Sequence, residues 1–374
     1  MFQYRSKMLL RLLALTVVAA AALAVAPASQ ARAPRDFVGL SADDVFAPRT
    51  GTAAGDEAYR LSNLSAIRAA HGRLLRKVFD WNEIETSPGH YNLGAYDRYV
   101  ADAASRGIKI LPILFNPPSF RAKGHGGHGT WPPASNAAFA DFAKVLVRRY
   151  GRHGSLWTSR RDIPKRPITS WQIWNEPNLT VYWLPRPNAR QYVRMLKVVG
   201  RAIKSIDGRR AEIVTAGIPP SLLSSAVPIV RYIRQLYRAG ARRYFSTFAL
   251  NSYARNRGEL AALLRTVRRL MNRYGHRRAK LWITELGWAT GGPRHRFNVG
   301  SVGQARRISS CFRLVRSLRV RYRIRGLVYF SWKDQRPYPP LFSDLWGLHT
   351  GLRTLDGRPK RGYFAFKRAT ARIR

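Results

Sequence analysis

The chain of 374 residues is long enough for one large domain, and 66 lysines and arginines against 20 acidic residues give it a formal net charge of +46. Its single cysteine, Cys311, excludes disulfides and thiolate zinc sites and is expected to be buried in a helix. The basic residues are scattered in pairs such as Arg268-Arg269, without the interleaved aromatics of a nucleic-acid-binding module.

Residues 1–33 are predicted to be a signal peptide. Three basic residues precede an apolar run, residues 12–26, and small residues follow it. This order is typical of a cleaved secretory signal, and the run is short for a membrane span. Cleavage is expected near residues 28–33, leaving residues 34–374 as a secreted or cell-wall-associated protein. An uncleaved N-terminal anchor is the alternative.

From residue 36 onward, β-like runs alternate with helical patterns. The predicted strands are residues 37–41, 74–81, 108–116, 168–176, 212–218, 245–253, 280–285 and 326–332. The predicted helices are residues 62–71, 94–106, 135–150, 188–206, 225–239, 259–274, 302–318 and 363–371. This alternation favours a parallel sheet with helical crossovers, and eight units suggest that the sheet closes. We therefore predict a single (β/α)8 TIM barrel.

Two predicted strands end in a glutamate beside tryptophan, Glu176 in the fourth strand and Glu285 in the seventh. Pro177 has no N–H and favours an extended residue before it, so Glu176 is expected at the strand tip. A barrel gathers the C-terminal ends of its strands at one face, so both carboxyl groups are expected there. Such a pair is the usual apparatus of glycoside hydrolysis. A Glu176 that only pairs with an arginine is the alternative.

The motifs Trp-Asn-Glu-Pro-Asn at 174–178 and Thr-Glu-Leu-Gly-Trp at 284–288 resemble the catalytic strands of clan A glycoside hydrolases, with families 5 and 39 nearest. The resemblance implies retaining cleavage of β-glycosidic bonds without a cofactor. It gives Glu176 the role of acid/base and Glu285 the role of nucleophile. Asn251 stands where some family 5 enzymes carry histidine, which is a departure from that family.

The resemblance also implies four supporting residues. Arg76 would pair with the nucleophile, unless it pairs with Asp80 instead. Asn175 would bond the 2-hydroxyl of the sugar, a contact that strengthens in the transition state. Tyr253 would bond the nucleophile. Trp332 would form the aromatic floor beneath the sugar, unless it only packs in the core.

A long loop, residues 117–133, follows the third predicted strand at the same face and is expected to shape the site. His125 and His128 lie in its glycine-rich part, with no acidic residue nearby. Two such histidines are a weak pattern for a metal, so neither a metal nor another cofactor is predicted.

Three functions remain open. The first is an exported retaining glycoside hydrolase that acts as a monomer on an oligo- or polysaccharide. The second is a transglycosylase with the same site, and the third is a catalytically weak protein that binds cell wall or polysaccharide. The basic exterior is either solvated and without a partner, or it associates with anionic cell-wall polymers.

Overall fold

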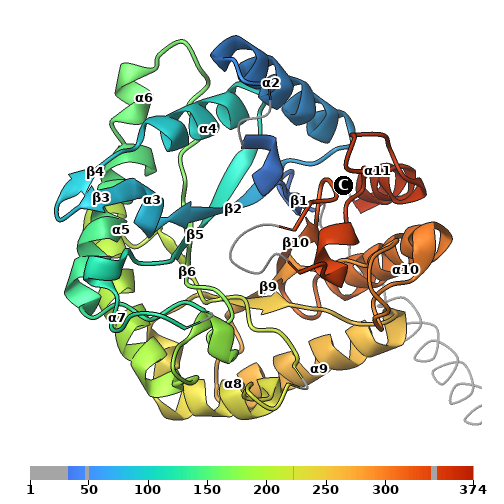
Figure 1. Ribbon diagram of the computed structural model, residues 1–374. Helices are drawn as coiled ribbons and strands as arrows, with labels where there is room; N and C mark the ends of the chain where they lie inside the picture. The colour runs from blue at the N-terminus through green and yellow to red at the C-terminus, as the bar shows by residue number, and fades with distance from the viewer. Residues whose placement is uncertain (1–32, 47–49, 128, 222, 338–342, 374) are drawn as a thin grey trace, which may run out of the picture. The chain divides into compact units, whose positions relative to one another are not determined.

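The computed structural model describes residues 33–46, 50–127, 129–221, 223–337 and 343–373 (Figure 1). The predicted signal peptide, apart from Ala33, lies outside the described residues, and so does His128. No helix within the described ranges is both long enough and apolar enough to cross a membrane.

Eight parallel strands form a closed barrel, which confirms the predicted (β/α)8 architecture. The barrel closes where β1 pairs with β10, with Val38 opposite Leu327. On its other side β1 pairs with β2, with Gly39 opposite Leu74. The barrel strands are β1 (Val38–Ser41), β2 (Leu74–Asp80), β5 (Lys109–Phe115), β6 (Ser170–Ile173), β7 (Glu212–Val214), β8 (Thr247–Asn251), β9 (Lys280–Glu285) and β10 (Ile324–Phe330).

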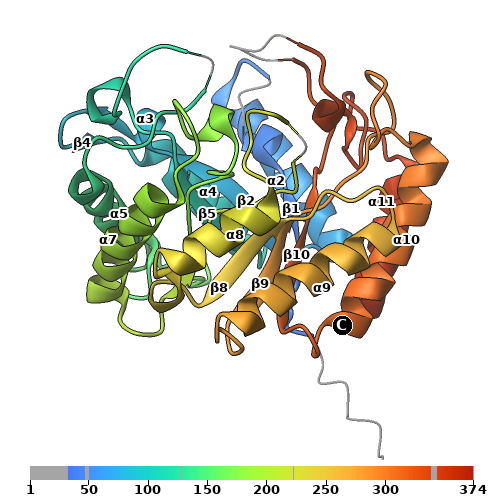
Figure 2. The same ribbon diagram turned by 90° about the horizontal axis from the view of Figure 1, so that it is seen from below.

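A ring of helices surrounds the strands, as Figures 1 and 2 show from two directions. The large helices are α2 (Ala53–Ala69), α4 (Gly94–Ser105), α5 (Asn136–Tyr150), α7 (Ala189–Asp207), α8 (Ile229–Arg238), α9 (Arg257–Arg273), α10 (Gly300–Leu318) and α11 (Arg361–Ile373). Four of them begin after a polar residue whose side-chain oxygen accepts a hydrogen bond from a first-turn N–H, namely Thr52, Ser135, Asn188 and Asn256. Cys311 is buried in α10, as predicted.

Short elements fill the connections and were not predicted. They are α3 (Trp81–Ile84), β3 (Glu85–Ser87), β4 (His90–Tyr91), α6 (Leu156–Ser159), η1 (Asp43–Phe46), η2 (Ser119–Arg121), η3 (Thr180–Tyr182), η4 (Ala241–Arg243) and η5 (Trp346–His349). Strands β3 and β4 form an antiparallel hairpin that is separate from the barrel.

The inside of the barrel is packed with apolar side chains. A buried cluster joins six of the strands through Leu74, Leu111, Val214, Ala249, Trp282 and Val328. Trp282 is its largest member and needs a glycine beside it, because a Cβ on Gly326 would lie 2.7 Å from the indole nitrogen. Since side chains fill the interior, reactive groups are carried at the strand ends instead.

The fourth strand departs from its prediction. β6 ends at Ile173, three residues before Glu176. Trp174 and Glu176 both have left-handed backbones, with φ of 75° and 43°. The expectation that Pro177 holds Glu176 extended is therefore wrong. Left-handed backbones are costly for non-glycine residues and cluster at functional sites, where the surrounding structure holds them in place.

Candidate active site

Glu176 and Glu285 meet at the C-terminal end of the barrel. Glu285 is the last residue of β9, and Glu176 follows β6, where its N–H donates to the carbonyl of Gly217 over 3.1 Å. Both residues are buried, each with 7% of its surface exposed. Asn251, the last residue of β8, lies between them, and its Nδ2 donates to Oε1 of Glu176 (2.6 Å) and to Oε1 of Glu285 (2.9 Å).

The shared nitrogen limits how far apart the two carboxyl groups lie. The two oxygens cannot be farther apart than the sum of the two hydrogen-bond lengths, about 5.5 Å. Asn251 was noted in the sequence only as a departure from family 5, so its bridging position is a finding of the structure.

Three neighbouring features fix the Asn251 amide. In the pairing of β8 with β9 the register slips at Thr284, so that Leu250 lies opposite Ile283 but Asn251 lies opposite Glu285. The Thr284 hydroxyl donates to Asn251 Oδ1 over 2.9 Å, which turns the amide nitrogen toward the carboxylates. Gly217 leaves room for the amide, because a Cβ there would lie 2.2 Å from Asn251 Oδ1.

Arg76 is buried on β2 and makes three polar contacts. Its Nη1 donates to Glu285 Oε1 over 2.7 Å. Its Nε donates to Gln172 Oε1 and its Nη2 to Asn175 Oδ1, each over 2.9 Å. Arg76 thus pairs with Glu285 and not with Asp80, whose carboxylate accepts from the Asn116 amide instead.

Tyr253 and Asn175 also lie at this site. The Tyr253 hydroxyl donates to Glu285 Oε2. Burial, and after it the charges of the two glutamates, raises the pKa of Tyr253 well above its ordinary value, so the hydroxyl remains a donor. Asn175 is half-buried, and its amide oxygen is occupied by Arg76, which leaves its nitrogen available to a ligand.

The surroundings of Glu176 favour its protonated form. Burial, and after it the negative charge of Glu285, raises the pKa of Glu176 to about 8, against the opposing effects of the Asn251 hydrogen bond and the Arg76 charge. Glu285, by contrast, receives donors from Arg76, Asn251 and Tyr253. The site therefore places a carboxyl group whose surroundings favour protonation, Glu176, beside a second carboxyl group that accepts hydrogen bonds from three donors.

Trp332 does not lie open to a sugar, which corrects the sequence prediction. Its side chain is fully buried (0% exposed), its indole N–H donates to Asn63 Oδ1 over 2.9 Å, and the Arg353 guanidinium covers the ring at 5.3 Å. The alternative, a tryptophan that packs in the core, agrees with these contacts. The strand ends at Phe330 and the chain then turns, so residues beyond it do not continue the strand pattern.

Besides the buried Phe297, two half-buried aromatic rings lie next to Tyr253. Phe330, at the end of β10, is half-buried with its ring centroid 6.4 Å from that of Tyr253. Trp346, in η5, is half-buried with a centroid distance of 5.1 Å to the same ring. Phe330 could have been found as the last residue of a strand, whereas Trp346 follows a long connection and carries no signal in the sequence.

No protein-family model matches the sequence, and no curated protein matches it. Solved structures resemble it in fold. A family 39 glycoside hydrolase from Bacteroides cellulosilyticus WH2 aligns with a TM-score of 0.66 at 18% identity, over 91% of this chain and 64% of that one. A GH39 β-xylosidase from Caulobacter crescentus aligns with a TM-score of 0.62 at 18% identity, over 90% and 71%. A glucosidase from Croceicoccus marinus aligns with a TM-score of 0.65 at 14% identity, over 92% and 69%.

The shared feature is the barrel. At these identities the comparison establishes the fold, and the chain spans less than two thirds of the length of the Bacteroides protein.

The loop of residues 117–133 packs beside the segment that follows Glu176. The N–H of Thr130 donates to the carbonyl of Val181 over 2.8 Å, and Arg121 forms an ion pair of 2.7 Å with the buried Glu85. His125 is exposed in this loop. Within the described part of the chain, no group of three or more His, Cys, Asp or Glu side chains is placed to hold a metal ion.

Proposed function

We propose that the protein is a retaining glycoside hydrolase that cleaves β-glycosidic bonds, with Glu176 as acid/base and Glu285 as nucleophile. The observation that carries this proposal is the pair of carboxyl groups joined through Asn251. A separation of about 5–5.5 Å is typical of retaining enzymes, whereas inverting enzymes need about 6.5–9.5 Å to admit a water. The limit set by Asn251 agrees with the retaining distance.

The first step forms a glycosyl ester. Glu176 donates its proton to the glycosidic oxygen while the Glu285 carboxylate attacks the anomeric carbon, and the bond to the leaving group breaks. Arg76 and Tyr253 hold Glu285 from two sides, so that it reaches the substrate without losing its orientation. Asn175 would donate a hydrogen bond to the 2-hydroxyl of the sugar.

The second step releases the sugar. Glu176, now ionised, takes a proton from a water molecule whose oxygen attacks the anomeric carbon. The ester bond breaks, Glu285 leaves as a carboxylate, and Glu176 is protonated again. Burial of Glu176 suits both steps, because a pKa near neutrality allows a group to give and to take a proton.

We assign the aromatic contact with the sugar to Phe330 and Trp346. Both rings are partly exposed and lie against Tyr253, which bonds the nucleophile. Sugar rings present apolar C–H faces that pack well on aromatic surfaces. The names of the similar structures, a β-xylosidase and a glucosidase, support a sugar substrate for this chain as well.

The anomeric configuration of the sugar that is released first tests the proposal. We would screen aryl β-xylosides, glucosides, galactosides and mannosides and follow the cleaved one by proton NMR. A retaining enzyme releases the β anomer before it equilibrates. The α anomer would show inversion, and a protein that cleaves none of these substrates or the common polysaccharides would contradict the proposal. Aryl release without free sugar would identify a transglycosylase.

We also propose that the protein is exported, on the pattern of residues 1–33. Expression of the whole gene should yield a mature protein whose mass lacks the first 28 to 33 residues. A full-length mass in the membrane fraction would favour the uncleaved anchor.

A further inference from the structure

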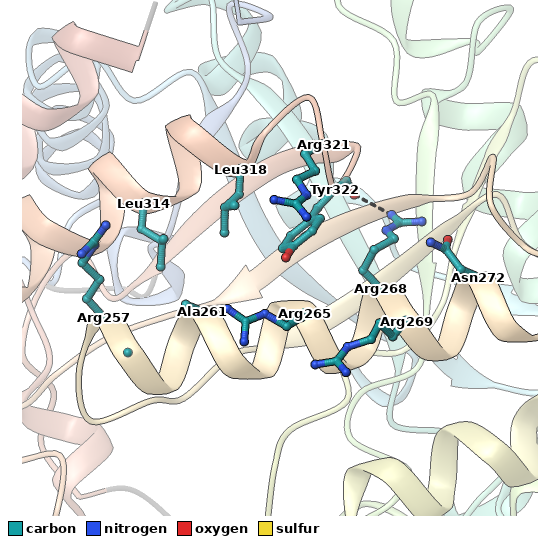
Figure 3. Close-up of a pocket in the computed structure, with 11 residues that line it drawn as sticks. Arg257, Ala261, Arg265, Arg268, Arg269, Asn272, Leu314, Leu318, Arg321 and Tyr322 are labelled. Atoms are coloured by element: carbon teal, nitrogen blue, oxygen red, sulfur yellow. Dashed lines mark hydrogen bonds between the residues drawn. The ribbon is translucent and has the colours of Figure 1, made fainter.

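Helices α9 and α10 leave a groove between them on the outer wall of the barrel, with a volume of about 710 Å³ (Figure 3). None of the catalytic-site residues lines it. No acidic residue lines it either, whereas five arginines do: Arg257, Arg265, Arg268, Arg269 and Arg321.

Three of these arginines form a row along α9. Arg257, Arg265 and Arg269 are exposed, and a rise of about 1.5 Å per residue spreads them over about 18 Å of the helix. A small anion would meet one or two of these side chains. A linear polyanion that follows the groove would meet all three, and Arg321 across the groove would add a fourth charge.

The four exposed arginines of the groove have no acidic partner among the described residues, although the Arg321 guanidinium lies over the Tyr322 ring at 5.8 Å. In the described residues, none of Arg257, Arg265, Arg269 and Arg321 forms an ion pair, although the nearby Arg255 is paired with Glu259. In a protein of this net charge, acidic partners are scarce. The exposed guanidinium groups of the groove are therefore open to an external anion.

Arg268 adds a buried charge to the groove wall. Only 5% of its surface is exposed, and its terminal nitrogens donate to the carbonyl of Ala279. One of them also donates to the carbonyl of Tyr322, as Figure 3 shows. Its Nε has no partner among the described residues. A buried guanidinium with no acidic neighbour gains stability from an anion bound close by.

We propose that this groove binds a linear acidic polysaccharide, a sugar chain that carries carboxylate or sulfate groups. The guanidinium fork matches the two oxygens of such a group. Leu318, which is half-buried, supplies an apolar contact for the C–H faces of sugar rings. A single-stranded nucleic acid would need exposed rings for stacking, and the only ring here, Tyr322, is 8% exposed.

Binding at this groove does not depend on the proposed catalytic function. The groove is the place where we propose that the protein associates with the anionic polymers suggested by its net charge.

The test compares two triple variants with equal loss of charge. One removes the groove row by Arg257→Gln, Arg265→Gln and Arg269→Gln. The matched control is Arg201→Gln, Arg231→Gln and Arg234→Gln on α7 and α8, where the three arginines are exposed and form no ion pair among the described residues. Binding of labelled polygalacturonate, dextran sulfate, neutral dextran and single-stranded DNA is measured at about 50 mM salt.

The groove triple should bind the acidic polysaccharides at least about tenfold more weakly than the unmodified protein, and the control triple less than about threefold. Comparing polygalacturonate with dextran sulfate shows whether the groove prefers carboxylate or sulfate groups. Neutral dextran should not bind. If the groove triple does not fold, Arg265→Gln alone is measured instead, and it should weaken binding of the acidic polysaccharides about threefold. Equal losses in both triples, unchanged binding in the groove triple, or tighter binding of DNA through the same arginines would each overturn the proposal.

Discussion

Glu176 and Glu285 are the same residue type, and their neighbours make them chemically different. Glu176 is buried, with only Asn251 donating to its side chain among the described residues, and the charge of Glu285 lies close to it. Glu285 accepts hydrogen bonds from the guanidinium of Arg76, the amide of Asn251 and the hydroxyl of Tyr253. Two carboxyl groups at this distance do not ionise together easily, so one proton stays at the site.

The raised pKa of Glu176 predicts a basic limb in the pH profile. Because the pKa of Glu176 is raised to about 8, the group carries the proton that the leaving group needs at neutral pH. Well above that pKa, kcat/KM should fall about tenfold per pH unit. The limb should disappear in Glu176→Ala with a dinitrophenyl glycoside, which needs no acid. A wild-type profile that stays flat from pH 7 to about pH 10, or a limb that persists in the variant, would contradict the assignment.

The two aromatic residues near the end of β10 should respond differently to truncation. Phe330→Ala should lower kcat/KM by about tenfold or more with little loss of stability, because we propose that its ring contacts the sugar. Trp332→Ala should instead lower the free energy of unfolding by about 3–5 kcal/mol, because it empties a buried site. Kinetics and chemical denaturation together decide the matter. A stable Trp332→Ala with impaired kcat/KM would restore the original assignment of Trp332.

At the scale of the elements, three strand ends cooperate to place one amide. β9 slips its register at Thr284, β8 ends at Asn251, and the chain after β7 offers a glycine, Gly217, where any Cβ would collide with that amide. The site is thus held by the backbone of neighbouring strands, which is more rigid than loops would be.

Gly217→Ala should displace Asn251 without touching either glutamate. The new Cβ would lie 2.2 Å from Asn251 Oδ1, so the amide must move away from the carboxylates, and we expect kcat/KM to fall by about tenfold or more. Gly94→Ala, at the start of α4, is the control, because its nearest neighbour would lie at 3.5 Å. Equal activity of the two variants would show that Asn251 does not depend on this glycine.

The sequence predicted what depends on local pattern. Glu285 ends a regular strand, Lys280–Glu285, with the bounds expected for it. The end of the fourth strand was missed because left-handed backbones at Trp174 and Glu176 are imposed by surroundings and not by residue type. The bridging role of Asn251 was missed for a similar reason, since it needs a register slip on one strand and a glycine after another.

In the whole molecule, the candidate active site and the arginine groove lie on different parts of the barrel. The C-terminal ends of β8 and β9 and the segment after β6 carry Asn251, Glu285 and Glu176, and the packed interior supports them. The outer wall between α9 and α10 carries the arginine groove. Variants of the groove are therefore expected to leave cleavage of a small neutral glycoside unchanged.

Glu176 and Glu285 have different roles in the proposed mechanism, and rescue by azide distinguishes these roles. In Glu285→Gly, azide should fill the vacant space and attack a β-glycoside once, giving the α-glycosyl azide.

In Glu176→Ala with a dinitrophenyl β-glycoside, the glycosyl ester on Glu285 still forms, and azide should displace it to give the β-glycosyl azide. The measurement is the anomeric configuration of the two azide products by NMR. We expect the α-azide from Glu285→Gly and the β-azide from Glu176→Ala. The reverse pattern, or near-wild-type turnover by both folded variants, would contradict the proposed roles.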